Sequence, residues 1–169
     1  MPFTKNTARD GLSIVHMSIV RFGTKKLKEN RFDNDMYAHL NNTVYTQLFD
    51  SIINSYLIAN CGMDPFSVND GSQGPKMKQI AIIATSYCDY FASVSFPDLL
   101  ELGLRVSRLG SSSVSYEVGV FKKGEDAVKV VGGYTHVFCD RESMRPAQGG
   151  MEDVVRKGLE GLVVDKARL

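Results

Sequence analysis

The residue types best suited to catalysis lie together in one polar segment, residues 33–42. It reads Asp33-Asn34-Asp35-Met36-Tyr37-Ala38-His39-Leu40-Asn41-Asn42, and so holds two carboxylic acids, one imidazole and three side-chain amides. A carboxylate can activate water or attack a carbonyl carbon directly, and an imidazole can move protons. The closing asparagines are common helix N-caps, and the backbone N–H groups of a helix start can stabilise an oxyanion. The segment is therefore a candidate chemical site at the N-terminus of a helix.

The residues that follow predict one long apolar helix that positions this segment. Between Leu40 and Met63 the only charged residue is Asp50. Apolar residues recur at a spacing of four in two adjacent rows, which are Val44, Leu48, Ile52 and Tyr56, and Tyr45, Phe49, Ile53 and Leu57. Gly62 suits a left-handed helix end, and Pro65 prevents the helix from resuming. A helix with so little charge is expected to be buried on most of its sides.

After the helix, apolar residues alternate with polar ones, which is typical of strands. The expected strands occupy Gln79–Tyr90, Leu100–Ser107, Ser113–Val120 and Ala127–Cys139. Gly110 and Gly124 mark the turns between the last three strands, and Gly132 with Gly133 indicates a bulge or a close backbone approach. This order predicts an α+β fold in which a curved antiparallel sheet of about five strands wraps around one long central helix.

The length of 169 residues is enough for one domain with its own core. We expect a flexible N-terminal segment at 1–12, a single domain at 13–163 and a C-terminal tail at 164–169. Within the domain, Ser13–Lys28 should contribute one or two extended segments and Glu152–Leu162 a short helix. The net charge of +1, without a basic stripe, argues against nucleic-acid binding.

Cysteine spacing and the ends of the chain bear on cofactors and compartment. Cys61, Cys88 and Cys139 have no metal-ligand spacing, so we expect no metal and no cofactor. An odd number of cysteines favours reduced thiols and a cytoplasmic location. No apolar run approaches the roughly 18 residues of a membrane span. The last three residues, Ala167-Arg168-Leu169, resemble a peroxisomal address, and the other interpretation is a chance tripeptide.

The polar segment and the helix start also match a known pattern. Asp35-x-x-Ala38-His39-x-Asn41-Asn42-x-x-Tyr45 resembles the Asp-x-x-Gly-His-x-Asn-Asn-x-x-Tyr signature of hotdog-fold acyl-CoA thioesterases of the 4-hydroxybenzoyl-CoA thioesterase type. Three later stretches are similar to landmarks of that family and follow in the same order: Tyr90–Pro97, Arg108–Ser113 and Val137–Pro146. The order of all four landmarks is more specific than any one of them.

The resemblance implies a hotdog fold and hydrolysis of an acyl-CoA thioester to a free acid and CoA, a reaction of lipid metabolism. It also implies a homodimer with sheets joined edge to edge, or a homotetramer, with active sites at subunit interfaces. Asp35 would be the catalytic carboxylate, as base or nucleophile, and the N–H of Asn42 would polarise the thioester carbonyl. His39 would assist catalysis by positioning the substrate. The residues expected to bind substrate are Tyr45, Asn41, Ser111 and Ser112.

Each of these residues also has a purely structural interpretation. Asp35 suits an Asx-turn or a helix cap, and Asp33 suits a solvated loop acid as well as a charged neighbour of Asp35. His39 suits a hydrogen-bonded loop anchor. The structural roles open to the remaining residues are helix caps for Asn41 and Asn42, a hairpin turn for Ser111 and Ser112, and a core or interface position for His136.

Asp50 is the backup catalytic acid, because some hotdog thioesterases carry their acid on the helix. It would lie about two turns into the helix, and its structural interpretation is a buried or interface polar contact. Ala38 stands where the family has glycine, so we expect the loop not to use a left-handed backbone there.

Two other functions stay open beside thioester hydrolysis. One is a non-catalytic module that binds acyl thioesters in an inert pocket. The other is a hotdog enoyl-CoA hydratase, which uses an Asp–His dyad with four residues between its members. Three residues separate Asp35 from His39, and this spacing counts against hydration.

Overall fold

The computed structural model describes residues 13–15, 33–63 and 78–163. Its elements in chain order are β1 (Ser13–Val15), α2 (Asn42–Cys61), β2 (Gln79–Tyr90), β3 (Leu100–Leu109), β4 (Ser113–Lys122), β5 (Val128–Asp140) and α3 (Asp153–Glu160). The predicted long helix, the four main strands and the short terminal helix are all present. The expected N-terminal segment at 1–12, the tail at 164–169 and its last three residues lie outside the described residues.

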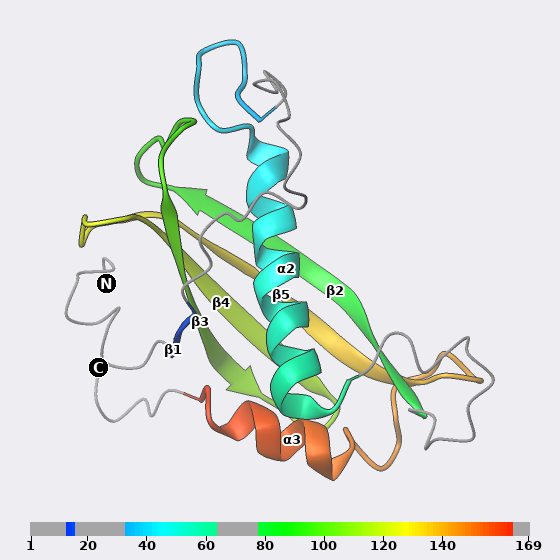
Figure 1. The fold of residues 1–169 in the computed structure, drawn as a ribbon. Coiled ribbons are helices and arrows are strands. Elements are labelled where there is room, and N and C mark those ends of the chain that lie inside the picture. The colour runs from blue at the N-terminus through cyan, green and yellow to red at the C-terminus, as the bar shows by residue number, and fades with distance from the viewer. Residues whose placement is uncertain (1–12, 16–32, 64–77, 164–169) are drawn as a thin grey trace, which may run out of the picture.

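The strands form one antiparallel sheet in the order β1-β3-β4-β5-β2. Helix α2 lies across one face of this sheet (Figure 1). The long strand β2 pairs with β5 on one side only, so it forms an edge of the described sheet. A register shift between Ile83 and Thr85 bends β2 partway along its length. The predicted α+β architecture with about five strands is confirmed.

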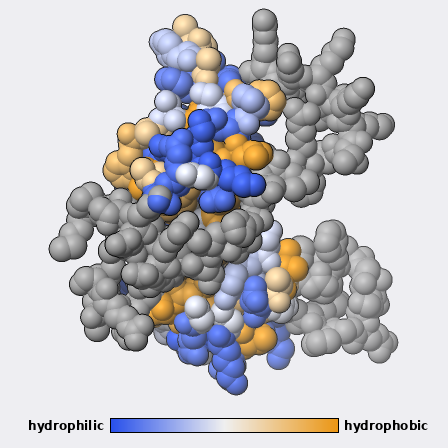
Figure 2. All heavy atoms as spheres, turned by 60° about the vertical axis from the view of Figure 1, so that its left-hand side comes forward, coloured by the Kyte–Doolittle hydropathy of each residue, from blue (hydrophilic) through white to orange (hydrophobic). Residues whose placement is uncertain are grey.

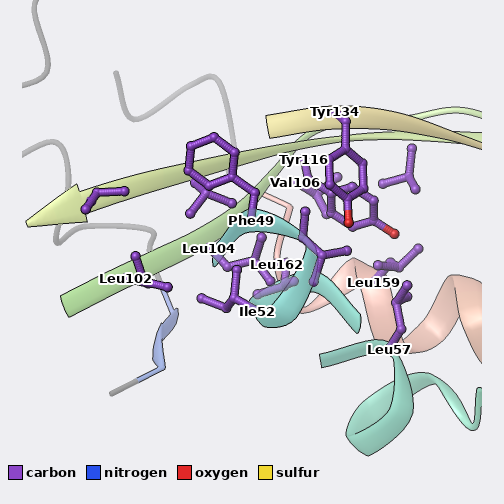
Figure 3. Packing of buried hydrophobic residues seen from close by; sticks show 14 of the residues in the cluster. Phe49, Ile52, Leu57, Leu102, Leu104, Val106, Tyr116, Tyr134, Leu159 and Leu162 are labelled. Atoms are coloured by element: carbon purple, nitrogen blue, oxygen red, sulfur yellow. The ribbon is translucent and has the colours of Figure 1, made fainter. Parts of the chain in front are cut away.

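Alternate residues of β3, β4 and β5 point toward α2 and form the core with its buried side. The buried residues labelled in Figure 3 come from α2, the sheet and the C-terminal region: Phe49, Ile52, Leu57, Leu102, Leu104, Val106, Tyr116, Tyr134, Leu159 and Leu162. The helix can approach the sheet closely because β5 has Gly132 at the crossing point. A Cβ atom at Gly132 would overlap the ring of Phe49. The glycine pair in the last strand therefore marks a close approach, as predicted.

Only one side of α2 is buried within the chain, which corrects the expectation of burial on most sides. The buried residues are Tyr45, Phe49, Ile52, Ile53, Leu57 and Cys61. Of the other apolar row, Val44, Leu48 and Tyr56 are half-buried. Uncharged polar residues such as Thr46 and Gln47 face outward. The prediction from low charge is therefore wrong, because amides and hydroxyls supply a hydrated face without any ionised group.

Helix α2 ends as its sequence predicts and packs against α3. Gly62 is the left-handed C-cap, with φ 65°. The hydroxyl of Tyr56 donates to the carbonyl oxygen of Gly158 at 2.8 Å, which joins the two helices. Val155 and Leu159 of α3 are buried against the core. The described helices include none with the length and apolar character needed to cross a membrane.

Candidate active site

The loop that carries the predicted acid is held closed by its own main chain. The N–H of Asp35 donates to the carbonyl of His39 at 2.7 Å, and the N–H of Asn41 donates to the carbonyl of Asp33, also at 2.7 Å. Two further hydrogen bonds tie the loop to the β2–β3 connection. The N–H of Leu40 donates to the carbonyl of Val94 at 2.8 Å, and the amide oxygen of Asn34 accepts from the N–H of Phe96 at 3.2 Å. Local and long-range contacts together therefore fix the position of Asp35.

The two oxygens of the Asp35 carboxylate have different surroundings. Oδ1 accepts hydrogen bonds from the backbone N–H groups of Tyr37, at 2.8 Å, and His39, at 3.0 Å. Oδ2 accepts none from the described residues. The Asx-turn interpretation is therefore correct for Oδ1, and it leaves a second oxygen for chemistry. The bonded oxygen orients the carboxylate, and Oδ2 is available to a water molecule or a carbonyl carbon.

Ala38 has a left-handed backbone, with φ 62°. The expectation that the loop avoids this conformation is wrong. The turn closes with the N–H of Ala38 donating to the carbonyl of Asp35 at 3.2 Å, and residue 38 must then reverse the chain so that His39 can reach Oδ1. The loop therefore keeps the geometry that glycine would provide, although in alanine this conformation costs about 1–2 kcal/mol.

The start of α2 presents one unused backbone donor. Asn41 is the N-cap, and its side chain accepts from the N–H of Thr43 at 3.0 Å, while its carbonyl accepts from the N–H of Val44 at 2.9 Å. Within the described chain, the N–H of Asn42 has no acceptor, and Asn42 is exposed. The first helical residue therefore offers both a free N–H and the positive end of the helix dipole. Asn41 has the structural role of a cap.

Tyr45 lies one turn into α2, is buried, and links the loop to strand β2. Its ring meets that of Tyr90 edge to face, with centroids 5.4 Å apart. Burial raises the pKa of Tyr45, the Cys88 thiol raises it further, a backbone hydrogen bond at Val94 lowers it, and the nearby Asp35 carboxylate adds a smaller increase. Two residues of β2, Cys88 and Tyr90, are thus neighbours of the candidate site that the sequence did not single out.

Asp50 lies two turns into α2 and has both carboxylate oxygens occupied. The hydroxyl of Tyr134 donates to Oδ1 at 3.2 Å, and the side-chain amide of Asn54 donates to Oδ2 at 2.9 Å. Burial, and next the Asp50 carboxylate, raise the pKa of Tyr134 well above its usual range. Asp50 itself is exposed, so its polar contacts lie at the surface of the helix and the expectation of a buried polar contact is wrong, while an interface contact stays a prediction.

His136 is buried beside Tyr134, as the core interpretation predicts. It is only 4% exposed, and its ring centroid lies 4.8 Å from that of Tyr134 and 5.5 Å from that of Tyr116. The rings of Tyr116 and Tyr134 have centroids 5.9 Å apart, and the two side chains lie near each other in Figure 3. Burial lowers the pKa of His136 to about 4, and Asp50 offsets this only in part. His136 is therefore neutral at pH 7.

The remaining predicted residues are divided between the two ends of the molecule. His39 is exposed, and its main chain closes the loop, in agreement with the loop-anchor interpretation. Ser111 and Ser112 form the β3–β4 turn, next to α3 and the C-terminal end of α2. There the carbonyl of Ser111 accepts from the N–H of Met151 at 2.8 Å and from Arg156 Nη2 at 3.1 Å. The fold of one chain therefore does not bring these serines to Asp35.

The residues that sequence reasoning missed share one face of β2. Cys88 and Tyr90 are two positions apart, and residues two apart in a strand point to the same face. The period-two pattern contained this signal, but it did not show which face lies beside α2. Among the described residues, no three His, Cys, Asp or Glu side chains are grouped to hold a metal ion.

The family comparison matches the region that contains the start and body of α2 and the next three strands. Residues 37–129 match the family model described as the thioesterase superfamily. The chain belongs to the thioesterase superfamily. The hotdog fold that the resemblance implied is therefore confirmed. No curated protein matches this superfamily member at a significant level.

Solved structures support the same fold. The PA5185 protein from Pseudomonas aeruginosa strain PAO1 is 38% identical, with 82% of this chain and 90% of that chain covered and a TM-score of 0.69. A thioesterase from Thermus thermophilus, solved with coenzyme A and Zn, is 22% identical, with coverages of 90% and 96% and a TM-score of 0.62. Slr0204 from Synechocystis, a 1,4-dihydroxy-2-naphthoyl-CoA thioesterase, is 13% identical, with coverages of 76% and 88% and a TM-score of 0.62. The last two comparisons show a shared fold.

Proposed function

We propose that this protein hydrolyses an acyl-CoA thioester to a free carboxylic acid and CoA, with Asp35 as the catalytic carboxylate. The observation that carries the proposal is the unequal use of the two Asp35 oxygens. Backbone donors at Tyr37 and His39 hold Oδ1, while Oδ2 accepts no hydrogen bond from the described residues. A carboxylate fixed through one oxygen is oriented in advance of the reaction, which lowers the entropic part of the barrier.

Oδ2 acts either as a general base on water or as the nucleophile itself. In the first route it takes a proton from a water molecule, whose oxygen adds to the thioester carbon. In the second it bonds to that carbon and forms a mixed anhydride, which water then hydrolyses. In both routes the carbonyl oxygen becomes negative and the CoA thiolate leaves. The free N–H of Asn42 is the proposed donor to this oxyanion, and one such donor contributes roughly 3 kcal/mol.

The test measures thiol release from a panel of acyl-CoAs by the wild type, Asp35→Asn and Asp33→Asn. Asparagine keeps an Oδ1 that accepts from Tyr37 and His39, so Asp35→Asn preserves the loop and removes only the charge and the reactive oxygen. We expect the wild type to release thiol and Asp35→Asn to lose about 10³-fold in kcat/KM. Asp33 is exposed on the same loop and is the matched control, with activity close to wild type.

Three outcomes would exclude parts of this proposal. Full activity in Asp35→Asn would remove Asp35 from catalysis. Binding of several acyl-CoAs without any thiol release would favour the non-catalytic binding module. Formation of a hydroxyacyl-CoA from an enoyl-CoA would favour the hydratase.

We also propose that the protein is at least a homodimer joined through β2. This strand is an edge of the described sheet, and its exposed apolar residues include Ile83, Tyr87 and Tyr90, each between 43% and 49% exposed. An exposed apolar edge strand favours pairing with another strand. A second copy of β2 can pair with it in antiparallel orientation, because each chain of a two-fold symmetric dimer offers the same edge. Such pairing would bring two sheets together edge to edge.

The oligomeric state is tested by light scattering after size-exclusion chromatography. We expect a mass of two or four times 18.7 kDa for the wild type. Ile83→Lys should shift the mass toward one chain, because a charge at the pairing edge must lose its hydration. Val154→Lys on α3 is the matched control, since Val154 is also an exposed apolar residue and lies outside β2. A wild-type mass of one chain would contradict the dimer.

A further inference from the structure

Strand β2 presents a row of side chains toward α2 that the proposed chemistry does not use. The β2–β5 register pairs Cys88 with Gly132 and Tyr90 with Val130. Directly paired residues of neighbouring strands point to the same face of a sheet. Gly132 faces the Phe49 ring of α2, and Val130 is fully buried. Cys88 and Tyr90 therefore lie on the face of β2 that is turned toward the helix.

These two residues stand next to the first turn of α2, where the proposed reaction takes place. The rings of Tyr45 and Tyr90 are in edge-to-face contact, and the side chains of Tyr90 and Cys88 are close enough that each affects the pKa of the other. Tyr45 lies close enough to Asp35 to respond to its charge. A continuous set of contacts therefore runs from the catalytic loop through Tyr45 to the edge strand.

Cys88 and Tyr90 differ from the core residues because they are partly exposed to solvent. Tyr90 is 49% exposed, and Cys88 is half-buried, whereas the neighbouring Tyr45 is 3% exposed. On β5, the position opposite Cys88 is Gly132, and the Phe49 ring occupies the space of the missing side chain. The Cys88 side chain therefore packs in part against the core, next to the strand position that faces the Phe49 ring.

We propose that Cys88 and Tyr90 form the wall against which the acyl group lies next to its thioester carbonyl, so that the side chain at position 88 limits the size of the acyl group. This inference rests on the proposed function, because it places the acyl group beside Asp35 and Asn42. The wall is apolar and aromatic where the acyl chain begins.

The thiol acts here as a packing surface and not as a nucleophile. Burial raises the pKa of Cys88, and the neighbouring Tyr90 hydroxyl offsets this only in part. The thiol is therefore protonated at neutral pH, and a protonated thiol attacks a thioester poorly. Its polarisable sulfur is suited to contact with an acyl chain.

The first experiment measures alkylation of Cys88 in the native wild type with N-ethylmaleimide, followed by peptide mass spectrometry. Labelling is compared without ligand, with CoA, and with 2-oxoheptyl-CoA, a ketone analogue of hexanoyl-CoA that cannot be hydrolysed. At about ten times its Kd, the analogue should slow Cys88 labelling about tenfold, and CoA should slow it much less. Cys61 and Cys139 are internal controls, because they are 0% and 5% exposed and should remain unlabelled in every sample.

A second labelling control is Glu160→Cys in a Cys88→Ser background. Glu160 is exposed at the end of α3, which packs near the opposite end of α2 from the Asp35 loop (Figure 1). The analogue should leave the labelling rate of this thiol unchanged. Equal labelling of Cys88 with and without a bound analogue would overturn the inference.

The second experiment changes the size of the wall. Cys88→Ala should raise, and Cys88→Leu should lower, the ratio of kcat/KM for hexanoyl-CoA to kcat/KM for acetyl-CoA, each by about tenfold, with the change mainly in KM. A ratio that stays the same in both folded variants would also overturn the inference. The two proposals fail separately: protection of Cys88 without hydrolysis contradicts the proposed function, and hydrolysis without protection contradicts the wall.

Discussion

Two acids of this protein, Asp35 in the loop before α2 and Asp50 within that helix, are held in opposite ways. Asp35 is fixed by backbone donors on one oxygen, and its other oxygen has no partner among the described residues. Asp50 is fixed by side chains, with Tyr134 on one oxygen and Asn54 on the other. Both residues were candidates for the catalytic acid. The difference in their hydrogen bonds favours the loop acid, because its second oxygen can reach a substrate without breaking a bond.

The side chains around the two acids also differ in how far their apolar surface is exposed. Around the loop, large apolar side chains are exposed, among them Met36, Tyr37, Phe91 and Phe96. Figure 2 shows hydrophobic side chains reaching the surface among hydrophilic ones at the upper end of the molecule, where Figure 1 places this loop. Beside Asp50, in contrast, the tyrosine and histidine side chains are buried. Among the described residues, apolar side chains near Asp35 are therefore exposed, whereas the aromatic side chains beside Asp50 pack the helix on the sheet.

The comparison of the two acids is tested most strongly by replacing each with asparagine. Asp35→Asn should lower kcat/KM about 10³-fold, whereas Asp50→Asn should lower it less than about tenfold. The measurement is steady-state thiol release, with circular dichroism to show that both variants fold. An effect of Asp50→Asn equal to that of Asp35→Asn would make Asp50 a catalytic residue.

The buried histidine beside Asp50 should make the stability of the protein sensitive to acid. The pKa of His136 is lowered to about 4 in the folded chain, from 6.5. Between these two pH values the unfolded chain therefore binds one proton more than the folded chain. The contribution of neutral His136 to the free energy of unfolding is fully present above pH 6.5 and falls as the pH decreases toward 4. The loss amounts to about 3 kcal/mol.

Urea unfolding of the wild type, His136→Phe and His39→Gln between pH 7.5 and 4 measures this loss. His136→Phe should lose less free energy of unfolding than the wild type over the window. His39 is exposed, so His39→Gln should follow the wild type. If His136→Phe loses as much free energy of unfolding as the wild type, then carboxylates, and not the buried imidazole, cause the loss.

At the start of α2, the N-cap residue Asn41 should contribute a smaller amount to the free energy of unfolding, and this contribution should not depend on pH. Asn41→Ala removes the acceptor of the Thr43 N–H at the start of α2 and should cost about 1 kcal/mol, while Asn41→Asp should retain most of the stability. Thermal unfolding at pH 7 compares the two variants. Equal stability of Asn41→Ala and the wild type would show that the loop holds the helix start without the cap.

The smallest expected effect comes from the strained residue of the loop. Ala38→Gly relieves the left-handed strain at φ 62°, but glycine also increases the entropy of the unfolded chain, so the net gain should be at most about 1 kcal/mol. Chemical unfolding measures the gain, and Ala92→Gly in the β2–β3 connection is a matched control outside the loop. A loss of stability in Ala38→Gly would show that the alanine side chain makes contacts that outweigh its strain.

Several features of the fold could be predicted because they depend on local pattern. The four-residue spacing through Tyr45 and Phe49 and the cap at Gly62 defined α2, and the alternation from Leu100 onward defined the strands. The conformation of Ala38 was not predictable in the same way. Residue type alone disfavours a left-handed alanine, and only the requirement that His39 reach Asp35 imposes it.

Other features depended on which parts of the chain meet. Charge predicted a helix buried on most sides, but the sheet covers one face of α2 and leaves its amides and hydroxyls to water. The position of Cys88 and Tyr90 beside α2 required the β2–β5 register, which sets the face on which they lie. The separation of Ser111 from Asp35 required the packing of the β3–β4 turn against α3.

The sequence by itself determined the elements, the helix start and the identity of the candidate acid, because each depends on residues close together in the chain. The tertiary structure decided which carboxylate has an oxygen without a hydrogen-bond partner among the described residues. It also decided which strand face borders the site and which end of α2 each loop occupies. These depend on hydrogen bonds and packing between residues far apart in the chain, such as Tyr134 with Asp50 and Asn34 with Phe96. No local pattern specifies those partners.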